Sequence, residues 1–400
     1  MTTVNLKQYS ERDTFREISA RTFVAVMNPH REILLGRGIV LPPIGREGEL
    51  DIKTMEAVCA SPDGLPAELV ETLHKISQMS GPETMDRIID TVRERQLELT
   101  FPANSSPKDV AAHLLLNDRV VFEELCAEKS ATRFRAFTYF VAREARAGFR
   151  PPASMAALEK TLDGWYESHQ RARTARVTWR QHGHEFWFHI RHAEPIKHDG
   201  CVNLVDLQSG SMIYRPERHG LVIYDSAAAE MRLHAGSEGE AELFRQGFGL
   251  RLFGDADHFP LGRAKYTLDP LRKWGRAALA CAGIDGLAGV KLTGLELCRR
   301  GEPGVRDSIS APDVFTAYES RQFRIPAEAE IRLAKFSVQF RDARKPRALT
   351  IRPSNFASFT RDEDAARLHE WLSRQGFVLT NGTVTPNHNT NHERFTLEHA

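Results

Sequence analysis

The chain has 400 residues, of which 41% are hydrophobic and 27% charged, and its formal net charge at pH 7 is +1. These proportions indicate a globular protein of roughly two to four domains and exclude a disordered or fibrous chain. Because the charges nearly cancel, a nucleic-acid partner would have to bind at a local basic patch.

The five cysteines are widely spaced and form no CxxC pair. This spacing excludes a disulfide framework or a zinc ribbon and is typical of a reducing compartment. No apolar run approaches the roughly 18 residues of a membrane span, and the first residues lack the apolar stretch of a signal peptide. We therefore predict a cytoplasmic protein without membrane contact. Only 12 of the 54 basic residues are lysines, a bias typical of GC-rich bacterial genomes.

Residues 1–54 are predicted to be a β-rich segment. The runs TFVAVM and EILLGRGIVL have strand-forming composition and are separated by Asn28 and Pro29. These runs do not provide a core of their own, so we expect the segment to pack on a neighbouring domain.

Helical spacing of apolar residues predicts a helical domain of about five helices over residues 55–175. The predicted helices include residues 65–76, residues 85–92, a segment that starts at Pro107, residues 134–145 and residues 155–165. Ser106 is a favourable N-cap for the third of them, with Pro107 at the first helical position.

Apolar and polar residues alternate again over residues 176–300, which predicts an antiparallel α+β domain. Gly183 is expected to form a tight turn between the first two strands. The predicted strands lie at 177–182, 186–191, 202–206, 212–214, 221–224, 231–234 and 287–297, and the predicted helices at 238–252 and 270–281.

The segment GEPGVRDSIS, residues 301–310, is predicted to be a linker. It leads to a small basic α+β domain at residues 311–380 and a polar tail at 381–400. In this ββα module, strands at 331–340 and 347–352 precede a helix at 360–375 that Thr360 caps. The predicted fold class is α+β, with an N-terminal helical domain, an antiparallel β-rich α+β domain and the C-terminal ββα module.

The hairpin of residues 331–352 contains one acidic and seven basic residues, which can contact a phosphate backbone. The candidate nucleic-acid-binding residues are Arg332, Lys335, Arg341, Arg344, Lys345, Arg347 and Arg352. The segment WLSRQGFVL downstream resembles the closing helix and wing of winged-helix modules, which implies contact with DNA. The alternative is a solvated strand face balanced by the acidic residues Asp362 to Asp364.

Five histidines within 17 residues form the second candidate site: His182, His184, His189, His192 and His198. Together with Asp255 and Asp257 of the loop GDADHF they offer imidazole and carboxylate ligands for a divalent metal. The alternative is a polar hairpin with half-exposed imidazoles. The stretch FHIRHAEP also resembles the RHxE motif of histidine phosphatases, although antiparallel strands are predicted to follow it here.

The P-loop, dinucleotide-binding, GxSxG and HExxH motifs are absent from the sequence. We therefore predict a non-catalytic binding or adaptor subunit of a bacterial cytoplasmic assembly, which contacts DNA or RNA through the basic hairpin and needs no cofactor. In this interpretation Arg341, Arg344, Lys345 and Arg347 contact phosphates. Two alternatives are a metal-dependent hydrolase (nuclease or phosphatase) that uses the histidine cluster, and a purely protein-binding structural subunit.

Overall fold

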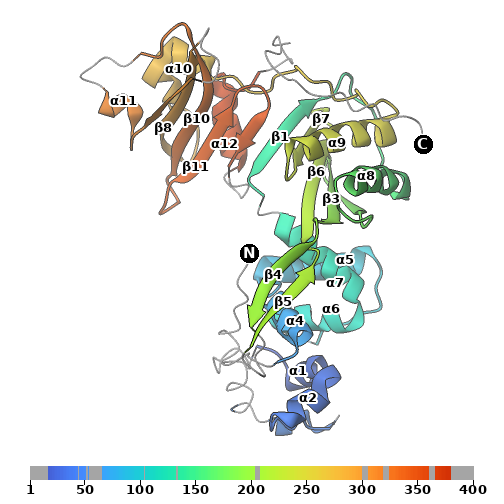
Figure 1. Cartoon of the computed structure of the whole chain (residues 1–400). Helices are drawn as coiled ribbons and strands as arrows, with labels where there is room; N and C mark the ends of the chain where they lie inside the picture. Colours follow the sequence, from blue (N-terminus) through green and yellow to red (C-terminus); the bar gives the residue numbers. More distant parts are fainter. Residues whose placement is uncertain are drawn as a thin grey trace. The chain divides into compact units, whose positions relative to one another are not determined.

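The computed structural model describes residues 17–43, 45–50, 53, 65–102, 104–131, 134–202, 208–299, 305–318, 324–359 and 365–379. The chain divides into two compact units (Figure 1). The helical unit comprises Met1–Ser130 and Lys197–Tyr214, and the sheet unit comprises Ala131–Ile196 and Arg215–Ala400. The predicted cap Thr360, the acidic residues that follow it and the tail at 381–400 lie outside the described residues.

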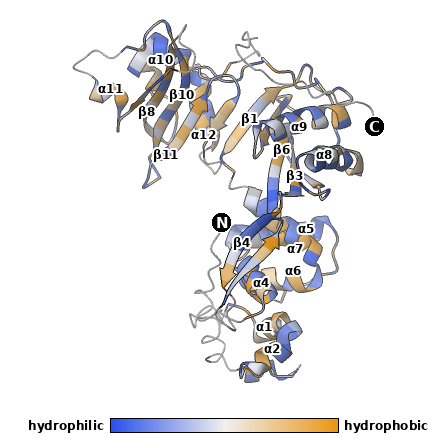
Figure 2. Ribbon diagram, in the orientation of Figure 1, coloured by the Kyte–Doolittle hydropathy of each residue, from blue (hydrophilic) through white to orange (hydrophobic). Residues whose placement is uncertain are grey.

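Amphipathic helices around one apolar core form most of the helical unit. Its helices are α1 (Ala20–Met27), α2 (Arg31–Gly36), α4 (Ala67–Gln78), α5 (Pro82–Glu94), α6 (Pro107–Asn117) and α7 (Arg119–Ala131), with short turns η3 (Asn28–His30) and η4 (Glu47–Glu49). Figure 2 shows that α4, α6 and α7 carry both hydrophobic and hydrophilic residues. A two-stranded hairpin, β4 (Lys197–Val202) and β5 (Ser209–Tyr214), completes the unit.

Both predicted β-strands of residues 1–54 are wrong, because TFVAVM lies in α1, and EILLG of the second run lies in α2. Ser19 caps α1 by accepting a hydrogen bond from the backbone amide of Thr22. Phe23, Val26 and Met27 lie at helical spacing and are buried in the core of the unit. Burial of this face outweighs the local strand propensity of the β-branched residues.

Several helices predicted from spacing and caps are confirmed. The Ser106 hydroxyl accepts a hydrogen bond from the amide of Asp109 at 3.1 Å, and Pro107 is the first residue of α6. The stripes at 65–76 and 85–92 belong to α4 and α5. The stripe at 155–165 belongs to α8 (Ala156–Ser168), which lies in the sheet unit.

The sheet unit contains one antiparallel sheet of ten strands in the order β2-β3-β6-β7-β1-β12-β11-β10-β8-β9. The strands are β1 (Ala136–Val141), β2 (Arg176–His182), β3 (Glu185–Ala193), β6 (Glu217–Asp225), β7 (Glu230–His234), β8 (Leu287–Arg299), β9 (Arg306–Ser310), β10 (Ala329–Phe340), β11 (Arg347–Arg352) and β12 (Phe356–Ser358). The predicted α+β fold class is confirmed. Gly183 has φ +59° in the turn between β2 and β3, as expected.

Two further predictions are corrected by the strand pairing. The predicted linker contains β9, which pairs with β8, so the expected domain boundary near residue 300 lies inside one sheet. The predicted helix at 134–145 contains β1, which pairs with β7 and β12. Because β1 is buried on both faces, its apolar residues do not alternate in the way that identifies a half-buried strand.

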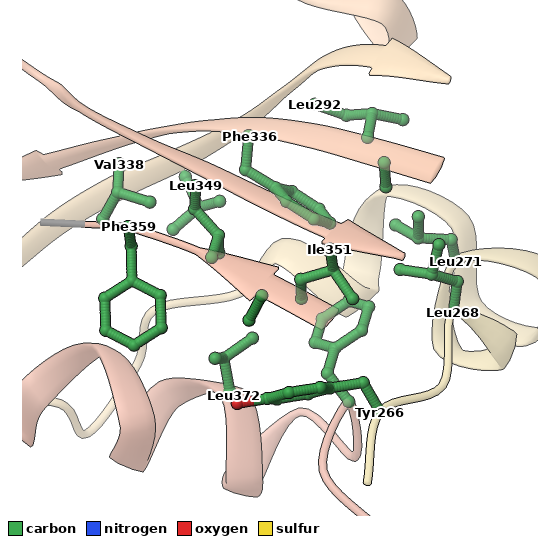
Figure 3. Packing of buried hydrophobic residues seen from close by; sticks show 14 of the residues in the cluster. Tyr266, Leu268, Leu271, Leu292, Phe336, Val338, Leu349, Ile351, Phe359 and Leu372 are labelled. Atoms are coloured by element: carbon green, nitrogen blue, oxygen red, sulfur yellow. The ribbon is translucent and has the colours of Figure 1, made fainter. Parts of the chain in front are cut away.

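Helices cover opposite faces of the two halves of the sheet. On one face, α8 and α9 (Glu238–Phe248) pack on β1, β3, β6 and β7, and the π-helical turn η5 (Gly249–Phe253) follows α9. On the other face, α10 (Asp269–Trp274), the turn η6 (Gly275–Leu279), α11 (Val314–Ala317) and α12 (Ala365–Arg374) pack on the half that runs from β12 to β9. Figure 3 shows Phe336, Leu349 and Ile351 on the side of the strands that faces Leu372 of α12. None of the helices in the described ranges has the length and apolar composition to cross a membrane.

Candidate nucleic-acid interface

The side of β8–β12 that faces away from α12 is exposed, and we term it the open face. Along β10 the buried residues Ile331, Phe336 and Val338 point toward α12, while Arg332 and Lys335 are exposed. Cross-strand pairs share a face in an antiparallel sheet, so the registers assign the remaining members. The open face includes Lys291, Gly294, Glu296, Arg306, Ser308, Ser310, Glu330, Arg332, Lys335, Ser337, Thr350, Arg352, Phe356 and Ser358.

Basic side chains outnumber acidic ones on the open face. The five basic residues are Lys291, Arg306, Arg332, Lys335 and Arg352, and the two acidic residues are Glu296 and Glu330. The carboxylate of Glu330 lies 3.1 Å from the guanidinium of Arg332, so part of this charge is compensated within β10. Both side chains of the pair are about half exposed, and an ion pair of this kind contributes little to stability.

A row of small residues flanks Lys335 across the sheet. Lys335 is opposite Gly294 on one side and opposite Thr350 on the other, and Thr350 is opposite Ser358. A β-carbon added to Gly294 would lie 3.3 Å from Cδ of Lys335 and 3.4 Å from its Cβ. The aliphatic stem of Lys335 therefore crosses the sheet over Gly294, and the face around it is flat.

One aromatic ring belongs to this surface. Phe356 is opposite Arg352 in the register, and the guanidinium carbon of Arg352 lies 4.9 Å from the centroid of the Phe356 ring. Its chain neighbour Ala357 is fully buried on the helix side, so Phe356 points outward and is half-buried. The cation–π contact places the guanidinium of Arg352 over one face of the Phe356 ring on the open face.

The seven basic residues predicted from the sequence do not form one surface. Three of them, Arg332, Lys335 and Arg352, lie on the open face. Three exposed ones, Arg341, Arg344 and Lys345, lie in the connection between β10 and β11. Arg347 is half-buried and is opposite Val338, which places it on the side of α12.

The connection between β10 and β11 is attached to the rest of the unit. The amide of Arg341 donates to the carbonyl of Gly286 at 2.9 Å, and Asp342 pairs with Arg367 of α12 at 2.9 Å. The hydrogen bond from Arg367 lowers the pKa of the Asp342 carboxyl below its usual value. In the segment predicted to resemble a winged helix, Trp371 of α12 is fully buried under the sheet. This helix is therefore part of the core.

The predicted histidine cluster is dispersed. His182 and His184 are exposed at the end of the β2–β3 hairpin, where the ring of His182 lies edge-on to Trp187. His189 and His192 are buried on opposite faces of β3, and His198 lies in β4 of the helical unit. Within the described ranges no three His, Cys, Asp or Glu side chains are grouped so that they can hold a metal ion. A metal site remains a prediction from the sequence.

The two aspartates of the predicted metal site face arginines. Asp255 lies 3.4 Å from Arg143, and Asp257 lies 3.5 Å from the buried guanidinium of Arg245. Desolvation lowers the pKa of His258 in the same loop, so its neutral form is favoured. These ion pairs hold the loop against α9.

A buried polar cluster centred on Glu240 was not predicted from the sequence. Its Oε1 atom lies 3.0 Å from Nε2 of His192, the hydroxyl of Tyr166 and Nη1 of Arg171, and its Oε2 atom accepts the amide of Gly236 at 2.6 Å. Desolvation of the buried carboxylate acts to raise the pKa of Glu240, but the hydrogen bonds from His192 and Gly236 outweigh this effect. The net result is a pKa lowered to about 2. The sequence signal that could have identified Glu240 is the Ser-x-x-Glu spacing of a capping box at the start of α9.

No protein-family model matches this sequence, and no curated protein matches it either. Function is therefore inferred from the side chains of the chain alone. Both oxygens of Glu240 are occupied by protein donors, which is the arrangement of a structural carboxylate. The open face instead presents basic, hydroxyl and aromatic groups to solvent, and these groups contact phosphates, sugars and bases in nucleic-acid complexes.

Proposed function

We propose that the protein is a non-catalytic, nucleic-acid-binding subunit of a bacterial cytoplasmic assembly, and that DNA or RNA binds to the open face. The observation that carries this proposal is the placement of Lys335, Arg332 and Arg352 on one exposed face, beside Lys291 and Arg306 of the neighbouring strands. A net positive face within a chain of net charge +1 is a local patch of the kind that attracts a polyanion.

The connection between β10 and β11 adds a second group of contacts at the edge of this surface. Arg341, Arg344 and Lys345 are exposed there. The connection contains a single acidic residue, Asp342, which forms an ion pair with Arg367. A phosphate backbone that crosses the open face can reach these three side chains at the end of β10. Arg347 is half-buried on the helix side and is assigned a smaller contribution.

Exposed apolar side chains on the hairpin of β4 and β5 support a protein partner as well. Val202, Met212 and Ile213 are 61%, 52% and 69% exposed. Within the described residues β4 and β5 pair only with each other, and an edge strand with exposed apolar side chains can pair with a partner chain. This feature supports the assignment of the chain as a subunit.

A charge-reversal experiment tests the proposal. The variant carries Arg332→Glu, Lys335→Glu and Arg352→Glu, and its affinity for labelled DNA and RNA is measured by fluorescence anisotropy at salt concentrations between about 50 and 200 mM. Three lost phosphate contacts on a single strand reduce the slope of log K against log salt by roughly 2. Thermal unfolding of the variant checks that the sheet is intact.

The matched control reverses three exposed basic residues that are not part of the open face: Arg93, Lys160 and Lys273. This control has the same net charge as the variant, so a general loss of attraction affects both equally. The proposal predicts that only the open-face variant loses most of its affinity. Equal binding by the two variants, or a wild-type protein that retains neither DNA nor RNA at low salt, refutes it.

A further inference from the structure

The width of the open face bears on the form of nucleic acid that it can bind. Five strands, β12-β11-β10-β8-β9, span four inter-strand spacings, or about 19 Å. The major groove of B-DNA is about 12 Å wide and admits a helix or a two-stranded ribbon. A sheet of this width cannot enter the groove, so base edges inside a duplex are out of its reach.

The β10–β11 hairpin is not a free ribbon that could enter the groove by itself. β10 pairs with β8 as far as Phe340, which is opposite Leu287, and β11 pairs with β12. Beyond Phe340 the connection is attached through Arg341 to Gly286 and through Asp342 to Arg367. Neighbouring strands and α12 therefore flank both sides of the hairpin.

The aromatic ring on the open face suits an unpaired base. Phe356 belongs to none of the three apolar cores and is half-buried, and the guanidinium of Arg352 lies over its ring. Bases in a duplex are stacked on one another, whereas the bases of a single strand can be splayed out and stacked on aromatic side chains or arginine planes.

The residues around this ring can accommodate a backbone. Thr350 and Ser358 present hydroxyl groups next to it, and Lys335 lies two strand spacings, about 10 Å, across the sheet from β12. Thr350 of β11 lies between Lys335 and Ser358 in the register, so a hydroxyl side chain separates the lysine from β12. Hydroxyl donors and lysine are groups that contact sugar and phosphate.

We infer that the open face binds single-stranded nucleic acid, with a base stacked on Phe356 and Arg352 and phosphates contacted by Lys335 and its basic neighbours. This inference rests on the proposed function. It assigns Phe356 the role of a stacking residue and separates it from the electrostatic residues, because stacking is insensitive to salt compared with phosphate contacts.

The test uses the full-length protein and two probes of about 12 nucleotides, an oligo(U) RNA and an oligo(dT) DNA, together with a mixed-sequence duplex of the same length. The variant Phe356→Leu keeps the apolar volume and removes the aromatic face. We expect it to weaken single-strand binding by about tenfold, with little change in duplex binding and in the salt slope. The matched control is Phe101→Leu, since Phe101 is a half-buried phenylalanine of the helical unit.

Each outcome decides between the two proposals. Single-strand binding that is tighter than duplex binding and falls with Phe356→Leu supports the inference, for the RNA probe, the DNA probe or both. Equal or tighter duplex binding, or an unchanged affinity of Phe356→Leu for both single strands, overturns the inference while the proposed function stands. No salt-dependent binding of any probe by the wild-type protein overturns the proposed function, and the inference with it.

Discussion

Replacement of Glu240 by glutamine is expected to destabilise the sheet unit at neutral pH. The carboxylate is 2% exposed and accepts hydrogen bonds from Tyr166, Arg171, His192 and the Gly236 amide. Lowering its pKa from 4.5 to about 2 corresponds to roughly 3 kcal/mol in favour of the ionised form in the folded protein. The glutamine amide also places an N–H donor where other donors converge on the carboxylate. We therefore expect the free energy of unfolding to fall by roughly 3 kcal/mol or more.

The same cluster predicts a pH dependence with a definite sign. Because the pKa of Glu240 is lower in the folded chain, its stabilising contribution is fully present above about pH 4.5 and is lost as the pH falls toward about 2. Urea denaturation followed by circular dichroism at pH 7, 4 and 3 measures the free energy of unfolding. The wild-type protein should lose roughly 2 kcal/mol of this contribution by pH 3, whereas the Glu240→Gln variant lacks it throughout.

The control for this experiment is Glu238→Gln, which removes an exposed carboxylate from the first turn of the same helix. Its expected effect is below about 1 kcal/mol, the size of an interaction with the helix dipole. If Glu240→Gln loses no more stability than Glu238→Gln at pH 7, or if its stability falls with acid as steeply as that of the wild type, the Glu240 carboxylate does not stabilise the folded sheet unit.

Two more predictions concern buried groups. Lys265 pairs with Glu230 and lies 4.9 Å from the Tyr139 ring, so Lys265→Met should cost roughly 3–5 kcal/mol by leaving Glu230 buried without its partner. Adding Glu230→Gln should recover much of this loss in the free energy of unfolding, measured by urea denaturation. Additive losses in the double variant would contradict the coupling. Burial raises the pKa of the Cys126 thiol to about 12, so iodoacetamide at about pH 8 should modify the exposed Cys201 well before Cys126. Mass spectrometry of tryptic peptides measures the two rates of modification, and equal rates would refute the prediction.

The sequence predicts elements well where one local signal decides. Ser106 and Pro107 define the start of α6, and the predicted strands at 331–340 and 347–352 lie in β10 and β11. TFVAVM is misassigned because the burial of Phe23 and Met27 in a helical core is not a local property. β1 is misassigned because a strand buried on both faces has no strict period of two.

Only part of the candidate interface was accessible from the sequence. A count of charges along the hairpin finds Arg332 and Lys335 but does not show that an irregularity between Ile331 and Leu333 changes the register with β8. It also treats Arg347 as equivalent to them. Lys291 and Arg306 join the open face through the strand order β9-β8-β10, which depends on long-range pairing.

The shortest strand of the sheet determines where its exposed aromatic residue points. β12 has three residues, and its fully buried Ala357 lies between Phe137 of β1 and Ile351 of β11. A slip of one residue would exchange the faces of Ala357 and Phe356 and would force a phenyl ring into the space of a methyl group. The core therefore rejects the slipped pairing, and a single alanine on the inner side keeps Phe356 on the outer side.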